Sequence, residues 1–277
     1  ARAALDGQAP PLVITLHGSD VPPADAPPGQ VQLLRKLVLD ADAVTVPSAA
    51  LGASARERLR LPEEPEVIPN FVDTDRFSPA ADRGALRALF PGRDLEGVRA
   101  LCHASNFRPV KRPLDLIRIF AVVRERMPAV LVLAGDGPER PRVQAEVERL
   151  GLAREVAFTG PLRNLPPLLR ACDLFLLPSA HESFGLAALE AMSCGMPVVG
   201  ARTGGLPEVV EDGVTGLLAT PGDAEAMGAM ALRILGDEPL HARLSRAARD
   251  RAVRLFRADP VLARWEALYA RVAAAGS

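Results

Sequence analysis

Residues 173–196 read DLFLLPSAHESFGLAALEAMSCGM, and this stretch decides the fold. The run DLFLLPS has the composition of a buried strand, and residues 185–194 have the length and composition of a helix. A strand, a short loop and a helix in this order place the start of the helix at the carboxyl end of a parallel strand. Backbone N–H groups at such a position bind anions such as a diphosphate. The stretch therefore predicts an anion-binding loop in a parallel α/β sheet.

Short apolar runs alternate with amphipathic stretches along almost the whole chain. This alternation is typical of parallel strands joined by crossover helices, and it predicts an α/β fold. Strands are expected at 12–16, 43–46, 66–68, 98–103, 129–134, 155–158, 173–177, 197–200 and 216–218. Helices are expected at 113–127, 138–150, 185–194 and 224–235, and from there to the end of the chain.

A Pro- and Asp-rich stretch, residues 70–82, separates two groups of strands and is the expected linker. Residues 79–255 supply enough strands for a complete doubly wound domain, whereas residues 1–78 supply only three. Three strands bury one face poorly, so we expect residues 1–78 to be the C-terminal part of a larger domain. We also expect that small sheet to leave an apolar edge or face uncovered and to favour self-association.

The composition argues against several classes of partner. The 277 residues carry a formal net charge of −1, which does not favour binding to nucleic acid or to an anionic membrane. The longest apolar stretches fall short of the ~20 residues of a membrane span. The odd count of three cysteines beside apolar runs indicates reduced core residues of a cytosolic protein.

Two glutamates of the opening stretch are candidate ligand-binding residues. Glu182 lies in the loop, and Glu190 is the only charged residue of the predicted helix, on the same face as Leu186. A carboxylate beside apolar neighbours needs donors, and sugar hydroxyls are suitable donors. Alternatively, Glu182 is a first-turn residue favoured by the helix dipole and Glu190 is merely exposed. Both interpretations are open from the residues alone.

A second candidate segment, SNFRPVKRP at residues 105–113, follows another predicted strand. Arginine and lysine just past a parallel strand are suited to neutralising phosphate. The alternative is a solvated basic turn. The following AGDGPE, residues 134–139, is a strand-to-helix turn whose glycines are expected to serve backbone geometry.

The spacing of Glu182 and Glu190 matches the E-x7-E pair of retaining glycosyltransferases, and residues 181–218 resemble the longest signature of glycosyltransferase family 4. The resemblance implies a GT-B arrangement of two Rossmann-like domains, with the N-terminal one incomplete in this chain. It implies that residues 256–277 form a helix crossing back to the N-terminal domain. It also implies a UDP-sugar donor and no cofactor.

The resemblance also implies roles for individual residues. Glu182 is expected to be catalytic, next to the reacting carbon of the donor sugar, and Glu190 to hold the ribose hydroxyls. Backbone amides of Phe184, Gly185 and Leu186 are expected to cradle the phosphates.

The basic segment departs from the family pattern G-R-L-x-x-x-K-G. Alignment on Lys111, a donor-phosphate ligand in the family, puts Asn106 at the arginine position, and either Arg108 or Arg112 is expected to replace the lost charge. The string SNFRPVKR resembles one branch of the family, the N-acetylglucosaminyl-malate synthases. That branch joins UDP-N-acetylglucosamine to L-malate, and these two molecules are the expected partners.

Two N-terminal segments agree with this branch. TLHGSD, residues 15–20, resembles a segment in which the histidine acts near the donor sugar, so His17 inherits a catalytic role, beside Thr15 in the cleft. Alone, a histidine after a strand is more often structural. VIPNFVDTDRF, residues 67–77, resembles the segment in which Asn70 lines the acceptor side. The Asp73–Asp75 pair lacks further oxygen ligands, and no metal site is expected there or elsewhere.

Three alternatives stay open. Another family 4 enzyme would use an inositol phosphate, a lipid-linked sugar or a cell-envelope glycan as acceptor. A sugar-nucleotide epimerase would lack the glutamate pair. A catalytically inactive UDP-sugar-binding fragment is the third, and this chain alone is expected to bind UDP without transferring sugar. Homo-oligomerisation is left open.

Overall fold

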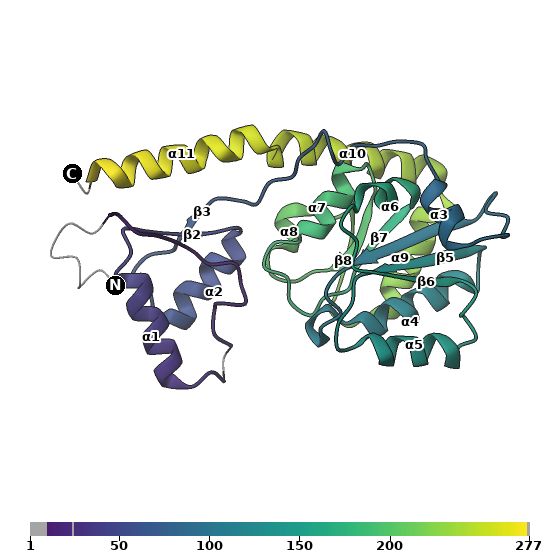
Figure 1. The fold of residues 1–277 in the computed structure, drawn as a ribbon, viewed down its shortest axis with the longest axis horizontal. Helices are drawn as coiled ribbons and strands as arrows, with labels where there is room; N and C mark the ends of the chain where they lie inside the picture. The colour runs from purple at the N-terminus through teal and green to yellow at the C-terminus, as the bar shows by residue number, and fades with distance from the viewer. Residues whose placement is uncertain (1–9, 24, 276–277) are drawn as a thin grey trace. The chain divides into compact units, whose positions relative to one another are not determined.

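The computed structural model describes residues 10–23 and 25–275. The chain divides into two compact units, each described by itself (Figure 1). Unit 1 comprises Ala1–Phe71 and Ala258–Ser277, and unit 2 comprises Val72–Arg257. Each unit is built on a parallel sheet, as the alternation of the sequence predicts.

Unit 1 contains a three-stranded parallel sheet in the order β1-β2-β3. Its strands are β1 (Val13–Thr15), β2 (Ala43–Val46) and β3 (Glu66–Val67), and its helices are α1 (Pro28–Leu39), α2 (Ala49–Leu59) and α11 (Ala258–Ala275). Because side chains alternate across a strand, Ile14 and Val44 pack with residues of α1 and α2, whereas Val13 and Ala43 pack with residues of α11.

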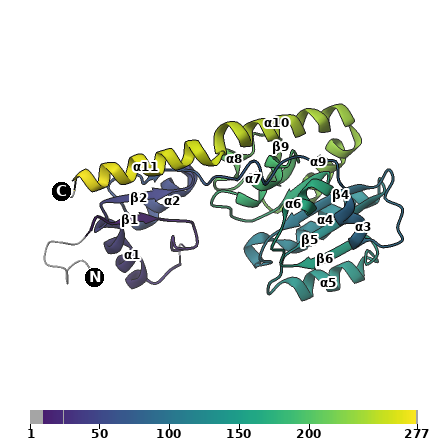
Figure 2. The same ribbon diagram turned by 45° about the horizontal axis from the view of Figure 1, so that its top comes forward.

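Helices therefore pack on both faces of this small sheet, and the expectation of an uncovered apolar face is wrong. The expectations of an open edge and of self-association stay predictions. Ile68, which follows β3, packs with Val261, Leu268 and Val272 of α11. Figure 2 shows α11 lying along the sheet of unit 1. The cover comes from the far end of the chain, so the three strands taken with their own two helices could not reveal it.

Unit 2 contains a six-stranded parallel sheet in the order β6-β5-β4-β7-β8-β9. Its strands are β4 (Arg99–Ala104), β5 (Ala129–Ala134), β6 (Val156–Gly160), β7 (Leu174–Leu177), β8 (Val198–Ala201) and β9 (Gly216–Ala219). Its helices are α3 (Gly84–Leu89), α4 (Pro113–Arg124), α5 (Arg140–Arg149), α6 (Pro166–Ala171), α7 (Leu186–Ser193), α8 (Leu206–Val209), α9 (Ala224–Gly236) and α10 (Glu238–Phe256), with a 3-10 turn at Pro109–Lys111.

The six-stranded sheet is buried on both faces, which explains why its strands are continuous apolar runs. All six residues of β5, AVLVLA, are buried. Val130 and Val132 pack on the side of α6 and α7, whereas Leu131 and Leu133 pack on the side of α4 and α9 (Figure 1). The order reverses between β4 and β7, and such a switch point is where doubly wound sheets bind ligands.

The segment after β3 belongs to unit 2 as far back as Val72. The Val72 N–H donates to the Phe256 carbonyl at 2.9 Å, and the Ser193 hydroxyl donates to the Phe77 carbonyl at 2.6 Å. The Arg249 guanidinium also donates to the Phe77 carbonyl, at 2.9 Å. Because these contacts fix the segment on unit 2, the units divide after Phe71 and not after residue 78.

All nine predicted strands are present, with ends that differ from the prediction by at most two residues, and the four helices predicted by range are α4, α5, α7 and α9. The three cysteines are free thiols; Cys102 and Cys194 are buried and Cys172 is half-buried. Within residues 10–23 and 25–275, no helix is long and apolar enough to cross a membrane.

Candidate functional site

The predicted loops of unit 2 meet at the switch point of its sheet. Strands β4 and β7 are parallel neighbours, and the Leu101–Leu174 pair sets their register. The loop 105–111 follows β4 and the loop 178–185 follows β7, so both leave the carboxyl edge of the sheet. The Ala180 N–H donates to the Val110 carbonyl at 2.7 Å, which joins the two loops.

A partly buried ion pair lies at this junction. The Lys111 ammonium lies 2.8 Å from Oε2 and 3.1 Å from Oε1 of Glu182, so it contacts both carboxylate oxygens. Glu182 is only 8% exposed. Charge-assisted hydrogen bonds of this kind are short and strong, and a carboxylate so far removed from water depends on its partner. Two residues predicted from separate motifs are thus direct neighbours.

The loop after β8 holds the backbone around Glu182 through hydrogen bonds. The Gly205 N–H donates to the Glu182 carbonyl at 2.8 Å, and the Thr203 hydroxyl donates to the Ala180 carbonyl at 3.0 Å. Gly204 has a φ of +51°, and a Cβ there would lie 2.0 Å from the same Glu182 carbonyl oxygen. Only glycine fits at this position, so Gly204 is required by the backbone geometry.

Glu190 lies on α7, one turn beyond the start of the helix. It is half-buried, so the alternative of a freely exposed glutamate does not hold. Burial raises the pKa of the Glu190 carboxyl above its usual range, and the positive charge of Arg76 acts in the opposite direction. A half-buried carboxylate of this kind is suited to accepting hydrogen bonds from a ligand.

At the start of α7, backbone N–H groups are available to a ligand. The Phe184 side chain is buried and packs edge-to-face against Phe256, with 5.7 Å between ring centroids, so only its main chain is available to a ligand. Gly185 is buried, and Leu186, the first helical residue, is exposed. The first amides of a helix have no partner within it and carry partial positive charge.

The structure distinguishes the two arginines of the basic segment. Arg112 Nε lies 2.5 Å from a carboxylate oxygen of Asp115, which is 3% exposed, and Arg118 binds the other oxygen at 3.1 Å. Arg108 is exposed, as is Asn106, and Arg108 has no ion pair among the described residues. Because Arg112 neutralises a buried carboxylate, Arg108 is the arginine with a free charge.

A residue that sequence reasoning missed, His103, lies beneath the basic loop in β4. Its side chain is fully buried, with Nδ1 2.8 Å from the Leu176 carbonyl and Nε2 2.7 Å from the Ser105 hydroxyl. The pKa of His103 is lowered to about 4, chiefly by burial; the hydrogen bond to the Leu176 carbonyl opposes this shift, and the positive charge of Lys111 contributes to it. A histidine inside an apolar strand, two residues before a serine, is the signal that could have found it.

The remaining predicted residues lie in unit 1. The Thr15 hydroxyl, at the end of β1, lies 2.8 Å from the Thr45 hydroxyl of β2. His17 has an exposed side chain, and its N–H donates to the Asp20 carboxylate at 2.9 Å. Asn70 is half-buried beyond β3. All three are near the carboxyl ends of their strands, the edge where parallel sheets place ligands.

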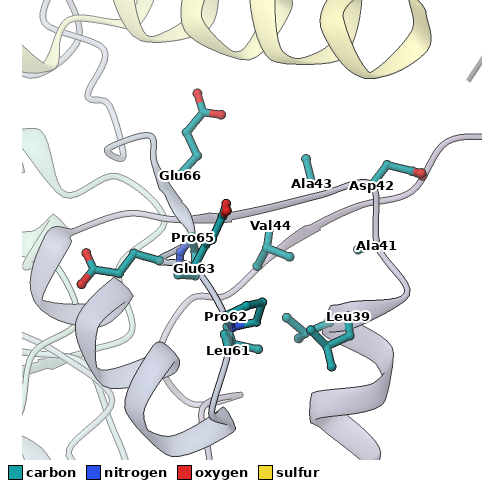
Figure 3. A pocket seen from close by; sticks show the side chains of 12 residues that line it. Leu39, Ala41, Asp42, Ala43, Val44, Leu61, Pro62, Glu63, Pro65 and Glu66 are labelled. Carbon is teal, nitrogen blue, oxygen red and sulfur yellow. The ribbon is translucent and has the colours of Figure 1, made fainter. Parts of the chain in front are cut away.

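The surface cavity of Figure 3 lies at the opposite edge of the unit 1 sheet. Asp42 and Glu66 at its rim precede or begin β2 and β3, so the cavity is at the amino ends of the strands. It contains none of the predicted site residues, and Glu66 is paired with Arg271. No cluster of three or more metal-ligating side chains occurs in the described part of the chain.

The doubly wound parallel sheet, together with the similarity to solved glycosyltransferases, defines an α/β protein of the GT-B type. Two family patterns match the chain: "Glycosyl transferases group 1" over residues 92–251 and "Glycosyltransferase Family 4" over residues 1–76. The chain belongs to the glycosyl transferases group 1 family.

Three similar proteins illustrate this relationship. The N-acetyl-alpha-D-glucosaminyl L-malate synthase of Bacillus anthracis is 36% identical over 93% of this chain and 67% of its own length. A D-inositol 3-phosphate glycosyltransferase of Saccharomonospora viridis is 33% identical over 88% of this chain and 61% of its own length. The crystal structure of Anabaena Alr3699/HepE in complex with UDP-glucose is 28% identical, with a TM-score of 0.85, over 94% of this chain and 72% of that one.

Proposed function

We propose that the protein is a retaining glycosyltransferase that moves N-acetylglucosamine from UDP-N-acetylglucosamine to L-malate. The Lys111–Glu182 pair carries the proposal, because a cation and a carboxylate lie side by side at the switch point; we assign the donor diphosphate to Lys111 and the donor sugar to Glu182. The UDP-glucose complex of a protein 28% identical to this chain supports a UDP-sugar donor.

The donor diphosphate binds to unit 2. Lys111 and Arg108 neutralise its charge, and the backbone N–H groups of Phe184, Gly185 and Leu186 at the start of α7 donate hydrogen bonds to its oxygens. Glu190 accepts hydrogen bonds from the ribose hydroxyls. Lys111, Arg108 and the amides at the start of α7 supply the positive charge that a metal would otherwise bring, so the proposal includes no metal or other cofactor.

Transfer breaks the bond between the anomeric carbon and the β-phosphate oxygen, and UDP leaves. The acceptor oxygen bonds to the anomeric carbon on the same face, which retains the configuration, and its proton passes to the departing phosphate. Negative charge grows on the phosphate, where Lys111 and Arg108 stabilise it, and positive charge grows on the sugar ring, where Glu182 stabilises it. We assign Thr15 and Asn70 to the acceptor side and His17 to a catalytic role near the donor sugar.

The acceptor is proposed from the relative named as an L-malate synthase, together with the SNFRPVKR string. An inositol phosphate is the second candidate, because several similar proteins are named D-inositol 3-phosphate glycosyltransferases. An acceptor assay on the full-length protein distinguishes them: UDP release from UDP-N-acetylglucosamine is measured without acceptor, with L-malate and with 1D-myo-inositol 3-phosphate. Malate-dependent release supports the proposal. Release that depends on 1D-myo-inositol 3-phosphate alone would replace L-malate as the proposed acceptor. No release with either acceptor would count against transfer.

A further inference from the structure

The loop that carries Arg108 and Lys111 contains a strained residue. Phe107 has a φ of +35°, a backbone region that aromatic residues rarely adopt, and its ring is fully buried. Such strain persists only where the surroundings impose it. The contacts around Phe107 therefore decide where the following residues, including both cations, are held.

One set of contacts begins at His103. Because a carbonyl oxygen only accepts, the ring N–H must be on Nδ1, where it donates to Leu176 at 2.8 Å. Nε2 is then unprotonated and accepts the Ser105 hydroxyl proton at 2.7 Å. The same hydroxyl oxygen accepts from the Phe107 N–H at 3.3 Å. A chain of hydrogen bonds thus runs from β7 through the imidazole to the strained residue.

The other side of the loop is held by the turn after β5. The Phe107 carbonyl accepts from the Glu139 N–H at 3.0 Å. Gly137 passes so close that a Cβ there would lie 2.0 Å from the Asn106 carbonyl oxygen. The His103 ring also stacks between Phe107 and Phe175, with centroids 6.3 and 6.1 Å away. The imidazole is therefore packed as well as hydrogen-bonded.

We infer that His103 and Ser105 are positioning residues for the donor diphosphate: through the Phe107 backbone they hold Arg108 and Lys111 in place. Neither touches the substrate. The inference rests on the proposed function, because it assigns the diphosphate to this loop. A purely structural role would lower stability without regard to the ligand, whereas a positioning role weakens ligands that contain phosphate more than those that lack it.

The test compares UDP and uridine binding by calorimetry in the wild type, Ser105→Ala and Ser105→Thr. Ser105→Ala removes the single hydroxyl that links His103 to Phe107, and loss of one such bond is expected to weaken UDP roughly 3- to 10-fold. Uridine affinity is expected to change less than about twofold, since it presents no phosphate. Ser105→Thr keeps a hydroxyl and is expected to restore UDP binding.

Thr215→Ala is the matched control. Thr215 is also buried and its hydroxyl also bonds to main chain, at Glu211, but it lies at the amino end of β9, at the opposite edge of the sheet from the site. This variant is expected to lose stability while keeping the ratio of UDP to uridine affinity. If Ser105→Ala keeps the wild-type ratio of UDP affinity to uridine affinity, the inference is overturned. Failure of the wild type to prefer UDP over uridine would instead overturn the proposed function.

If Ser105→Ala does not fold, His103→Gln is measured in its place, because its amide retains a donor and an acceptor. A folded His103→Gln with a reduced preference for UDP supports the inference, and one with the wild-type preference contradicts it.

Discussion

The ammonium of Lys111 and the carboxylate of Glu182 are direct partners, 2.8 Å apart, although 71 residues separate them in the chain. A UDP-sugar bound as proposed takes the diphosphate to Lys111 and the sugar to Glu182. Both residues then exchange a protein partner for a substrate partner. Variants of one residue are therefore expected to alter the behaviour of the other, and the two single changes are expected not to be additive.

In the full-length protein, Glu182→Gln is expected to lower kcat at least ~100-fold, because an amide no longer stabilises positive charge on the sugar ring. UDP affinity is expected to stay the same or rise, since Lys111 loses a competing anion. Steady-state kinetics and a UDP titration on one preparation give both numbers. Wild-type turnover would show that the Glu182 carboxylate is not part of the chemistry.

Lys111→Ala is expected to weaken UDP by about 10- to 100-fold, since a charge-assisted contact contributes about 1.5–3 kcal/mol. Uridine has no phosphate, so its affinity is expected to change little. Lys36, the other lysine of the chain, is exposed on α1 in unit 1, and Lys36→Ala is the control for removal of a lysine charge. Equal losses for UDP and uridine would assign Lys111 a structural role.

Arg108→Ala is expected to weaken UDP selectively while leaving the midpoint of thermal unfolding almost unchanged, because the side chain is exposed. Arg112→Ala is expected to lower that midpoint, because it removes a partner of the buried Asp115. Thermal melts and UDP titrations of both variants check this pair of outcomes. The reverse pattern would make Arg112 the replacement for the arginine that Asn106 displaces.

The pH dependence of stability is expected to carry the signature of His103. Burial lowers its pKa from 6.5 to about 4, so the unfolded chain binds a proton between these values and the folded chain does not. The contribution of neutral His103 to the free energy of unfolding is thus fully present above pH 6.5. It is lost as the pH falls toward 4, which lowers the free energy of unfolding by about 3 kcal/mol. Urea unfolding of the wild type and His103→Gln from pH 7 to 4 measures it. Parallel curves of unfolding free energy against pH for the wild type and His103→Gln would contradict the assignment of this pH dependence to His103.

Turnover is expected to survive EDTA, because Lys111, Arg108 and the amides of α7 supply the positive charge that the leaving diphosphate requires. UDP release before and after chelation checks this. Complete inactivation that magnesium or manganese reverses would require metal ligands that the proposal does not include.

The sequence alone determined the strands, the main helices and the two loops of the site. Apolar runs such as AVLVLA report burial on both faces of a strand, and residues 181–196 place Glu182 and Glu190 around the start of a helix. These features are local, so each is readable from a short window of residues.

The tertiary structure decided which residues meet. Strand order brings β4 beside β7 and thereby Lys111 to Glu182, and no local pattern encodes that order. It likewise decided that Arg249 binds the segment after Val72 to unit 2. The role of His103 depends on a carbonyl of another strand, Leu176. Which side chains pair depends on how distant segments pack, because a hydrogen bond or ion pair is stronger when both of its groups are removed from water together.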